Sequence, residues 1–213
     1  MSHAQFQRAT CCDALAAAGP GASTLCEGWT AHDLAAHLWV RENDVVGALG
    51  IGAPVLARLT RQRMDEVKRL LSFTELVAAL RGGPPRMSVF AVPGVDEAAN
   101  ALEFFVHGVD VRRAGAGLGD PAVQPGWEDL VWRRLGALGR LLFRKAPVGI
   151  VLERDDVPDA PTRRLRPGSD TVTLVGPPSE LALYGFGRRS VARVRVIAAP
   201  ATRAQFEALD LGI

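Results

Sequence analysis

The spacing of apolar residues changes near residue 145, and this change constrains the fold of the 213-residue chain more than any other feature. Upstream of it, apolar side chains recur with the period of an amphipathic helix. The stretches that show this period are 4–18, 31–49, 54–80 with a break near Ser72, 95–114 and 127–143. We therefore expect a helical bundle over residues 1–145.

Downstream of residue 145 the sequence is typical of short strands and short helices. β-branched residues are frequent in 148–152, 171–175 and 191–197, which predicts strands. Residues 178–184 and 202–209 favour helices instead. The expected fold class is thus mainly α, with the helical bundle followed by a small α+β domain over residues 146–213.

Charge, apolar run length and cysteine spacing each argue against a class of protein. The chain has 25 basic and 23 acidic residues, and its arginine pairs are scattered, whereas nucleic-acid-binding proteins gather such charge into a stripe. No apolar run reaches the roughly 18 residues of a membrane span, and the amino terminus lacks the pattern of a signal peptide. Cys11, Cys12 and Cys26 form no CxxC pair. We expect a cytoplasmic protein with reduced thiols that binds neither nucleic acid nor membranes.

Four histidines occur, and two of them indicate a buried polar site. Glu103 and His107 are four residues apart, so they share one face of a helix that is otherwise apolar. Burying a carboxylate and an imidazole without partners costs several kcal/mol. In the helix expected over 31–49, His37 lies among apolar neighbours and is the available partner. His32 is about 140° away around that helix and cannot join the same site.

The set of His37, Glu103 and His107 matches a zinc site in which two imidazoles and one carboxylate leave a fourth position open. One carboxylate against a divalent ion leaves a net charge near +1, which favours an anionic fourth ligand such as hydroxide, thiolate or enolate. Another divalent metal such as Ni²⁺ is the alternative to zinc. The same Glu-His spacing also occurs in solvated or hydrogen-bonded helix pairs, so the spacing alone leaves that interpretation open.

Nearby charged residues are candidates for orienting these ligands. Asp33 and Arg41 lie within about 40° of His37 around their helix, and Asp110 follows soon after His107. Each could hydrogen-bond to a ligand from behind, or each could be a surface charge. Thr30 followed by Asp33 is also the pattern of a helix N-cap.

Two segments carry motifs known together from one family. Residues 28–38, GWTAHDLAAHL, contain W-T-x-x-D-L-x-x-H-L, and residues 103–114, EFFVHGVDVRRA, contain E-x-x-x-H-x-x-D-x-x-R-A. In both segments the chain resembles the mycothiol-dependent maleylpyruvate isomerase and DinB-like family. Residues 176–181 and 184–188 resemble the carboxy-terminal domain of an actinobacterial branch. The preference for arginine over lysine suits a GC-rich actinobacterial genome.

The resemblance implies a four-helix bundle that binds a divalent metal, usually zinc, through His37, Glu103 and His107. It also implies an isomerase or S-transferase with mycothiol as co-substrate and an electrophilic small molecule as substrate. Arg188 and Arg189 are candidates to contact carboxylates of the thiol or the substrate, since arginine binds such groups in bidentate fashion. A solvated strand edge is the alternative for this pair.

Two other interpretations of function compete with a thiol-dependent enzyme. The chain could be a non-enzymatic metal- or ligand-binding module, but a structural zinc usually has four protein ligands, and the sequence offers three with Cys26 as a distant fourth. Gly115, Gly117 and Gly119 could form a phosphate-binding loop, but they follow a helix rather than a strand. Helix termination explains these glycines more simply. A homodimer is left open.

Overall fold

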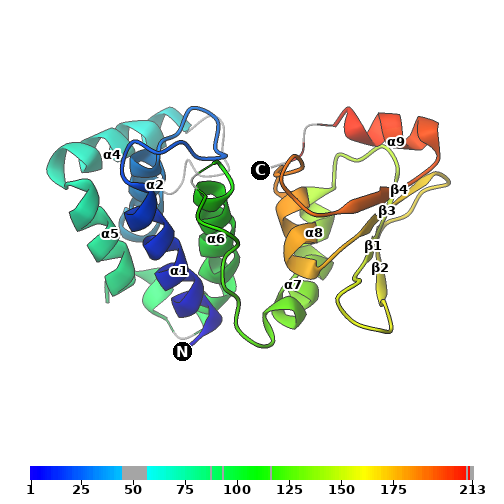
Figure 1. Cartoon of the computed structure of the whole chain (residues 1–213), viewed down its shortest axis with the longest axis horizontal. Helices are drawn as coiled ribbons and strands as arrows, with labels where there is room; N and C mark the ends of the chain where they lie inside the picture. Colours follow the sequence, from blue (N-terminus) through cyan, green and yellow to red (C-terminus); the bar gives the residue numbers. More distant parts are fainter. Residues whose placement is uncertain (45–56, 87, 93, 116, 210, 212–213) are drawn as a thin grey trace. The chain divides into compact units, whose positions relative to one another are not determined.

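The computed structural model describes residues 1–44, 57–86, 88–92, 94–115, 117–209 and 211. These residues form a mainly α protein with one small sheet, as the sequence predicts (Figure 1). They divide into two compact units, Met1–Gln124 and Pro125–Ile213. The division therefore lies earlier than the boundary expected at residue 145. In these described ranges, no helix combines the length and the apolar character needed to cross a membrane.

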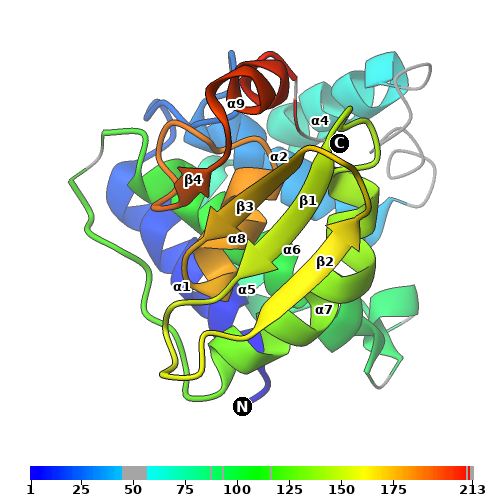
Figure 2. The same cartoon turned by 90° about the vertical axis from the view of Figure 1, so that its right-hand side faces the viewer.

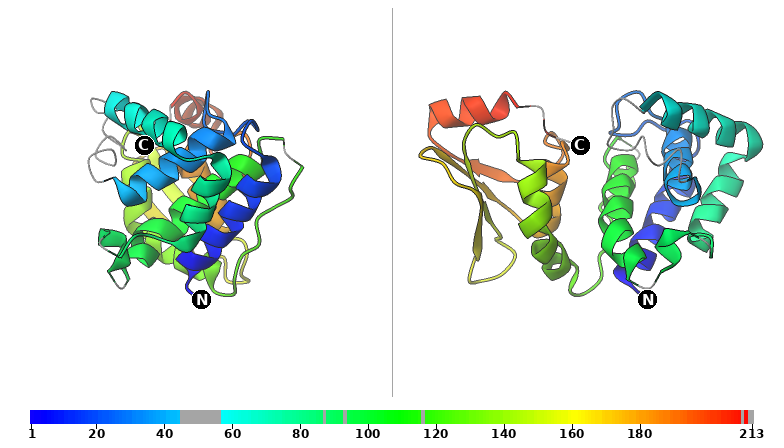
Figure 3. Two further views of the ribbon diagram at one scale, coloured as in Figure 1. Left: turned by 90° about the vertical axis from the view of Figure 1, so that its left-hand side faces the viewer. Right: turned by 180° about the vertical axis from the view of Figure 1, so that it is seen from behind.

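The first unit is helical (Figure 3), and its buried side chains form an apolar core. α1 packs along α6, and α5 packs against both α1 and α2. Fully buried leucines from these helices, together with Phe104, fill the space between them. The elements are α1 (His3–Ala18), α2 (Ala31–Asn43), α4 (Ala57–Leu70), α5 (Phe73–Gly82), the 3₁₀ turn η2 (Val89–Ala91) and α6 (Val95–Arg112).

Side-chain caps define where three of these helices begin. Ser2, Thr30 and Ser72 each accept a hydrogen bond from the backbone N–H three residues on, and the side chain at that position accepts from the cap's own N–H. The cap predicted at Thr30 and the break predicted near Ser72 are confirmed. The helix expected over 31–49 ends earlier, because α2 stops at Asn43 and Asp44 is extended. The start of the helix expected over 54–80 lies outside the described residues.

The second unit combines helices with a four-stranded sheet of order β2-β1-β3-β4. β1 and β3 run parallel, and each outer strand is antiparallel to its neighbour. α7 and α8 cover one face of this sheet (Figure 2). The elements are α7 (Trp127–Leu142), β1 (Gly149–Glu153), β2 (Thr162–Arg166), β3 (Thr171–Val175), α8 (Pro178–Gly185), β4 (Arg195–Ile197) and α9 (Pro200–Glu207).

The position of α7 explains why the division lies before it. α7 packs on α8 and β2, and an added Cβ at Gly139 of α7 would lie 2.6 Å from a methyl group of Leu165 in β2. Helical periodicity identifies a helix, but it does not show which core the apolar face joins. The sequence also does not predict β2, because Leu165 is its one buried residue, as suits an edge strand rich in arginine.

Candidate metal centre

Two helices of the first unit supply a cluster of ligating side chains. His37 lies on α2, and Glu103 and His107 lie one turn apart on α6. Leucines of α2 and phenylalanines of α6 are buried in the core, so they fix the direction in which each helix presents its polar side chains. His37 is 7% exposed and His107 is 9% exposed, so both imidazoles belong to the interior.

The three side chains lie close enough to share one ion. Glu103 Oε1 is 3.6 Å from His37 Nε2 and 3.3 Å from His107 Nε2. One ligating atom from each residue lies within 4.8 Å of the others. Two atoms bonded about 2.1 Å from a tetrahedral zinc lie about 3.4 Å apart. The distances from the carboxylate to both imidazoles therefore fit a common metal ion.

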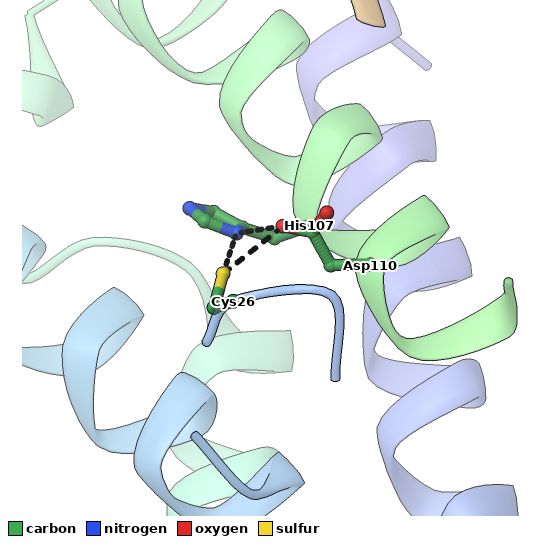
Figure 4. Close-up of side chains that lie close together, drawn as sticks. All are labelled: Cys26, His107 and Asp110. Carbon is green, nitrogen blue, oxygen red and sulfur yellow. Dashed lines mark hydrogen bonds and ion pairs between the residues drawn. The ribbon is translucent and has the colours of Figure 1, made fainter. Parts of the chain in front are cut away.

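Asp110 fixes the orientation of His107 (Figure 4). Its Oδ2 lies 2.9 Å from His107 Nδ1, and the Asp110 side chain is fully buried. When a carboxylate accepts a hydrogen bond from Nδ1–H of a neutral imidazole, the lone pair of Nε2 is available for a metal. Since Nε2 is the atom that faces Glu103, the contact that the sequence predicts for Asp110 suits metal binding.

Cys26 reaches the same carboxylate from the loop before α2. Its Sγ lies 3.3 Å from Asp110 Oδ2 and 4.0 Å from His107 Nδ1 (Figure 4). Cys26, His107 and Asp110 form a second group of potential ligands, but the short bond from Nδ1 to Asp110 already occupies that side of the ring. The thiol therefore does not complete the set formed by His37, Glu103 and His107. Cysteine spacing does not predict this contact, because it joins distant segments of the chain.

Arg41 holds Glu103 in place. Its Nε lies 3.4 Å from Glu103 Oε1, its Nη2 donates to the Ala99 carbonyl over 3.1 Å, and its Nη1 donates to Asn100 Oδ1. The guanidinium also lies 5.1 Å from the centroid of the Phe90 ring. Because every nitrogen of its guanidinium is engaged, Arg41 acts as a scaffold for the glutamate.

Asp33 has a different role from the one considered for it. Its carboxylate accepts from the Thr30 backbone over 2.9 Å and from the Thr30 hydroxyl over 2.6 Å, and it pairs with Lys68 Nζ at 2.6 Å. Partial burial raises the pKa of Asp33, but the bonds from Lys68 and Thr30 lower it below its ordinary value. Asp33 therefore caps α2 and does not orient His37.

Burial and hydrogen bonding together set the ionisation of the ligands. Burial lowers the pKa of His37, so this imidazole is neutral at pH 7. Burial alone would raise the pKa of Glu103, but bonds with His107 and His37 hold it well below its ordinary value. Burial opposes a charge on His107, yet bonds to Asp110, Cys26 and Glu103 raise its pKa well above the ordinary value. A raised pKa means that His107 holds a proton on each ring nitrogen without a metal, so zinc binding would release the proton of Nε2. Once that proton has left, two imidazoles and an ionised carboxylate form a donor set that suits zinc.

The second imidazole, that of His37, faces Glu103 through Nε2 and packs against an aromatic ring. The centroid of the His37 ring lies 5.0 Å from that of Trp29. His37 Nδ1 is buried and has no hydrogen-bond partner within the described ranges. Packing against Trp29 therefore confines the His37 ring, but unlike Asp110 it does not determine which ring nitrogen carries the proton. The motif around residues 29–38 contains this tryptophan, but its contact with His37 does not follow from the sequence.

Arg188 and Arg189 lie in the second unit, in the turn after α8. Arg188 Nη1 donates to the Phe186 carbonyl over 2.6 Å. Arg189 donates to backbone carbonyls at the end of α9, and its guanidinium lies 5.0 Å from the centroid of the Phe206 ring. Arg189 thus links the turn after α8 to the end of α9. Contact of either arginine with a thiol or a substrate stays a prediction.

Comparison with known proteins identifies solved structures that share the fold of this chain. No protein-family model matches the sequence, and no curated protein does. Two crystal structures of the mycothiol-dependent maleylpyruvate isomerase are similar, one being of a histidine-to-alanine mutant; each match covers 98% of this chain and 93% of that chain. The TM-scores are 0.53 for the mutant at 16% identity and 0.50 for the other structure at 17%. At these identities the likeness shows a shared fold, which is the fold that the resemblance of the motifs implies.

Proposed function

We propose that this chain is a zinc-dependent enzyme of the actinobacterial cytoplasm that uses a small thiol, mycothiol, to isomerise or conjugate an electrophilic small molecule. The observation that carries the proposal is the meeting of His37, Glu103 and His107 at distances that fit one ion. The fold supports it, because the structural neighbours are described as mycothiol-dependent isomerases. Ni²⁺ or another divalent ion would fit the same three ligands.

The residues of the centre would hold the metal with one coordination position open. His37 and His107 would each give a nitrogen and Glu103 an oxygen, while Asp110 orients His107 and Arg41 orients Glu103. Across the part of the chain that the structure describes, no fourth His, Cys, Asp or Glu joins this group. Zinc sites with three protein ligands keep the fourth position for water or substrate. When bound, zinc supplies a positive charge that lowers the pKa of a coordinated thiol.

A thiolate can bring about either of the proposed reactions. It adds to one carbon of a conjugated double bond, and the electrons of that bond move toward the acceptor group of the substrate. The remaining single bond can rotate, and departure of the thiolate restores the double bond in the other geometry, so the thiol is recovered unchanged. If the adduct instead takes up a proton and is released from the enzyme, the net reaction is transfer of the thiol to the substrate.

Metal analysis of protein purified without added metal tests the centre. We expect one zinc per chain, lost in Glu103→Ala and in His37→Ala. His32→Ala is the matched control, because His32 also belongs to α2 but its ring packs against Phe73, 5.7 Å away between centroids. Metal that is retained by both ligand variants, or lost equally in the His32 variant, contradicts the proposed centre.

Incubation with mycothiol and electrophiles, maleylpyruvate among them, tests the chemistry. Mass spectrometry detects thiol adducts, and chromatography separates the two isomers of an unsaturated acid. We expect turnover that needs both zinc and the thiol, that is absent in Glu103→Ala and that persists in His32→Ala. If zinc-loaded protein yields no adduct and no isomer, the enzymatic part of the proposal fails and the metal site stands.

A non-enzymatic module with a structural metal is the second candidate. The observation in its favour is that the ligands link α2 to α6 inside the bundle, where both imidazoles are less than one-tenth exposed. The position of Cys26 opposes it, because its thiol lies on the Nδ1 side of His107 and adds no fourth ligand. His37→Ala separates the two candidates. Loss of activity with unchanged helical circular dichroism supports an enzyme, and loss of folding supports a structural metal.

A further inference from the structure

A pocket of the second unit gathers arginines around an apolar wall. It has a volume of about 220 Å³ and lies where the end of α7 meets the end of β2. Three of the lining residues are apolar and three are arginines; they are Phe143, Leu165, Pro167, Arg140, Arg144 and Arg166. The metal ligands all belong to the first unit, so this pocket is built from a separate set of residues.

Local structure explains why these side chains meet. Arg140 is an exposed residue of the last turn of α7, and Arg144 follows the end of that helix. In β2 the buried Leu165 alternates with the exposed Arg166. Arg166 Nη1 donates to the Arg144 carbonyl over 3.1 Å, which joins the strand to the end of the helix. The basic pocket thus forms where the end of α7 contacts β2.

The positive charge of this pocket is not balanced by acids. Among the residues that the structure describes, no carboxylate forms an ion pair with Arg140, Arg144 or Arg166, whereas Arg154 and Arg203 of the same unit do have such partners. Burial lowers the pKa of Arg163 on the same strand as Arg166, and the nearby positive charge of Arg140 lowers it further. The negative end of the α7 dipole amounts to roughly half a charge, and it cannot offset three guanidinium groups.

We propose that this pocket binds a phosphate monoester that carries a small apolar group. A dianionic phosphate offers three terminal oxygens, and guanidinium groups bind such oxygens through short, charge-assisted hydrogen bonds. Arg144 and Arg166 each donate to a backbone carbonyl, and each guanidinium retains further N–H donors. Phe143, Leu165 and Pro167 offer the ester group an apolar surface. The volume is below that of typical pockets for drug-sized ligands, so the ligand is small.

Calorimetric titration of the full-length chain with phenyl phosphate tests this site, in a phosphate-free buffer of constant ionic strength. We expect saturable binding of one ligand per chain. Arg140→Gln and Arg166→Gln should each weaken binding roughly tenfold, as expected for loss of a hydrogen bond to a charged group. Arg164→Gln is the matched control, because Arg164 lies on the same strand, is exposed and does not line the pocket. Its affinity should stay within about twofold of the parent.

Each alternative outcome overturns a defined part of the proposal. Absence of saturable binding overturns the site, and an equal loss in Arg164→Gln shows diffuse charge attraction instead of a pocket. Equal affinity for benzoate overturns the choice of phosphate, and equal affinity for inorganic phosphate overturns the role of the apolar wall. Thermal melts of the variants establish that each is folded. Glu103→Ala should bind phenyl phosphate like the parent, so this site and the metal centre can fail independently.

Discussion

His107 uses its two ring nitrogens for different partners, and this division explains the residues around it. Nδ1 faces Asp110 at 2.9 Å, and Nε2 faces Glu103 at 3.3 Å. A buried carboxylate behind an imidazole keeps the ring from turning and makes the opposite nitrogen a better metal ligand. The position of Asp110 thus determines which nitrogen of His107 the centre can use.

Replacing Asp110 by asparagine should weaken the centre without removing a ligand. The amide keeps the size of the carboxylate but loses the charge that supports His107, so zinc affinity should fall roughly 10- to 100-fold. Competition with a chromophoric chelator measures the change. Asp13→Asn is the control, since Asp13 is exposed and pairs with Arg81 at 2.6 Å. Unchanged affinity in a folded Asp110→Asn variant would contradict the orienting role.

Replacing Arg41 by lysine tests the support of Glu103. Lysine keeps the positive charge but cannot contact Glu103, Asn100 and the Ala99 carbonyl together, because its ammonium is a single point. We expect zinc affinity to drop roughly tenfold, whereas Arg69→Lys on the exposed face of α4 should have no effect. The opposite outcome is a zinc affinity that is unchanged in Arg41→Lys and reduced in Arg41→Met. It would show that only the positive charge matters and that the planar guanidinium is unimportant.

The residues of the centre differ in how far the sequence predicts them. His37, Glu103 and His107 can be grouped because each is a polar residue among apolar neighbours on a helix. Asp33 lies on nearly the same side of α2 as His37, but it is four residues, or about 6 Å along the helix axis, closer to the start of the helix. At that position its carboxylate reaches the N-cap residue and not the His37 ring. Cys26 contacts α6 only because the loop before α2 folds back, and helical periodicity cannot predict the path of a loop.

At the scale of elements, α2 is fixed at both ends, and His37 lies between the two anchors. Thr30 and Asp33 form the cap at its start. Near its end, the buried Glu42 receives two bonds of 2.6 Å from Arg8 of α1 and one of 2.7 Å from Asn100 of α6. Asn100 also accepts from Arg41, so the anchor of α2 is connected to the support of Glu103.

Loss of the α2 cap should affect both stability and metal binding. Thr30→Ala should lower the free energy of unfolding by about 1 kcal/mol, because it removes a side-chain cap. It should also weaken zinc binding, since the start of α2 sets the direction of His37. Ser72→Ala removes the equivalent cap of α5, which carries no ligand, and should cost similar stability at constant zinc affinity. Denaturant unfolding and chelator competition give the two quantities, and equal zinc affinities in both variants would contradict the link.

The order of elements follows from the sequence more fully than their grouping does. Helical periodicity, capping residues and glycine-rich breaks suffice for α1, α2, α5 and α6. The same signals cannot assign α7 to a unit, because the partner of its apolar face is a strand whose sequence, TRRLR, has little β-branched character. That strand depends on pairing with β1, which is a tertiary contact.

At the scale of the whole molecule, the described residues form two units with separate buried side chains, and the candidate ligands belong to the first unit. The core of the first unit includes Leu15, Leu34 and Phe104. In the second unit, Val131, Leu135, Ile150 and Leu174 are fully buried. A ligand that binds the native form of a unit stabilises that unit by mass action. Zinc therefore reports on how independent the two units are.

Zinc should raise the stability of the first unit alone. At free zinc 100 times its Kd, the gain should be about 2.7 kcal/mol, seen in calorimetry of the full chain as an upward shift of one of two transitions. Leu135→Ala should lower the other transition, since truncating a buried leucine costs about 2–5 kcal/mol, and Glu103→Ala should abolish the zinc-dependent shift. A single transition that zinc moves as a whole would show that the units unfold together, because binding at one unit would then stabilise both cores.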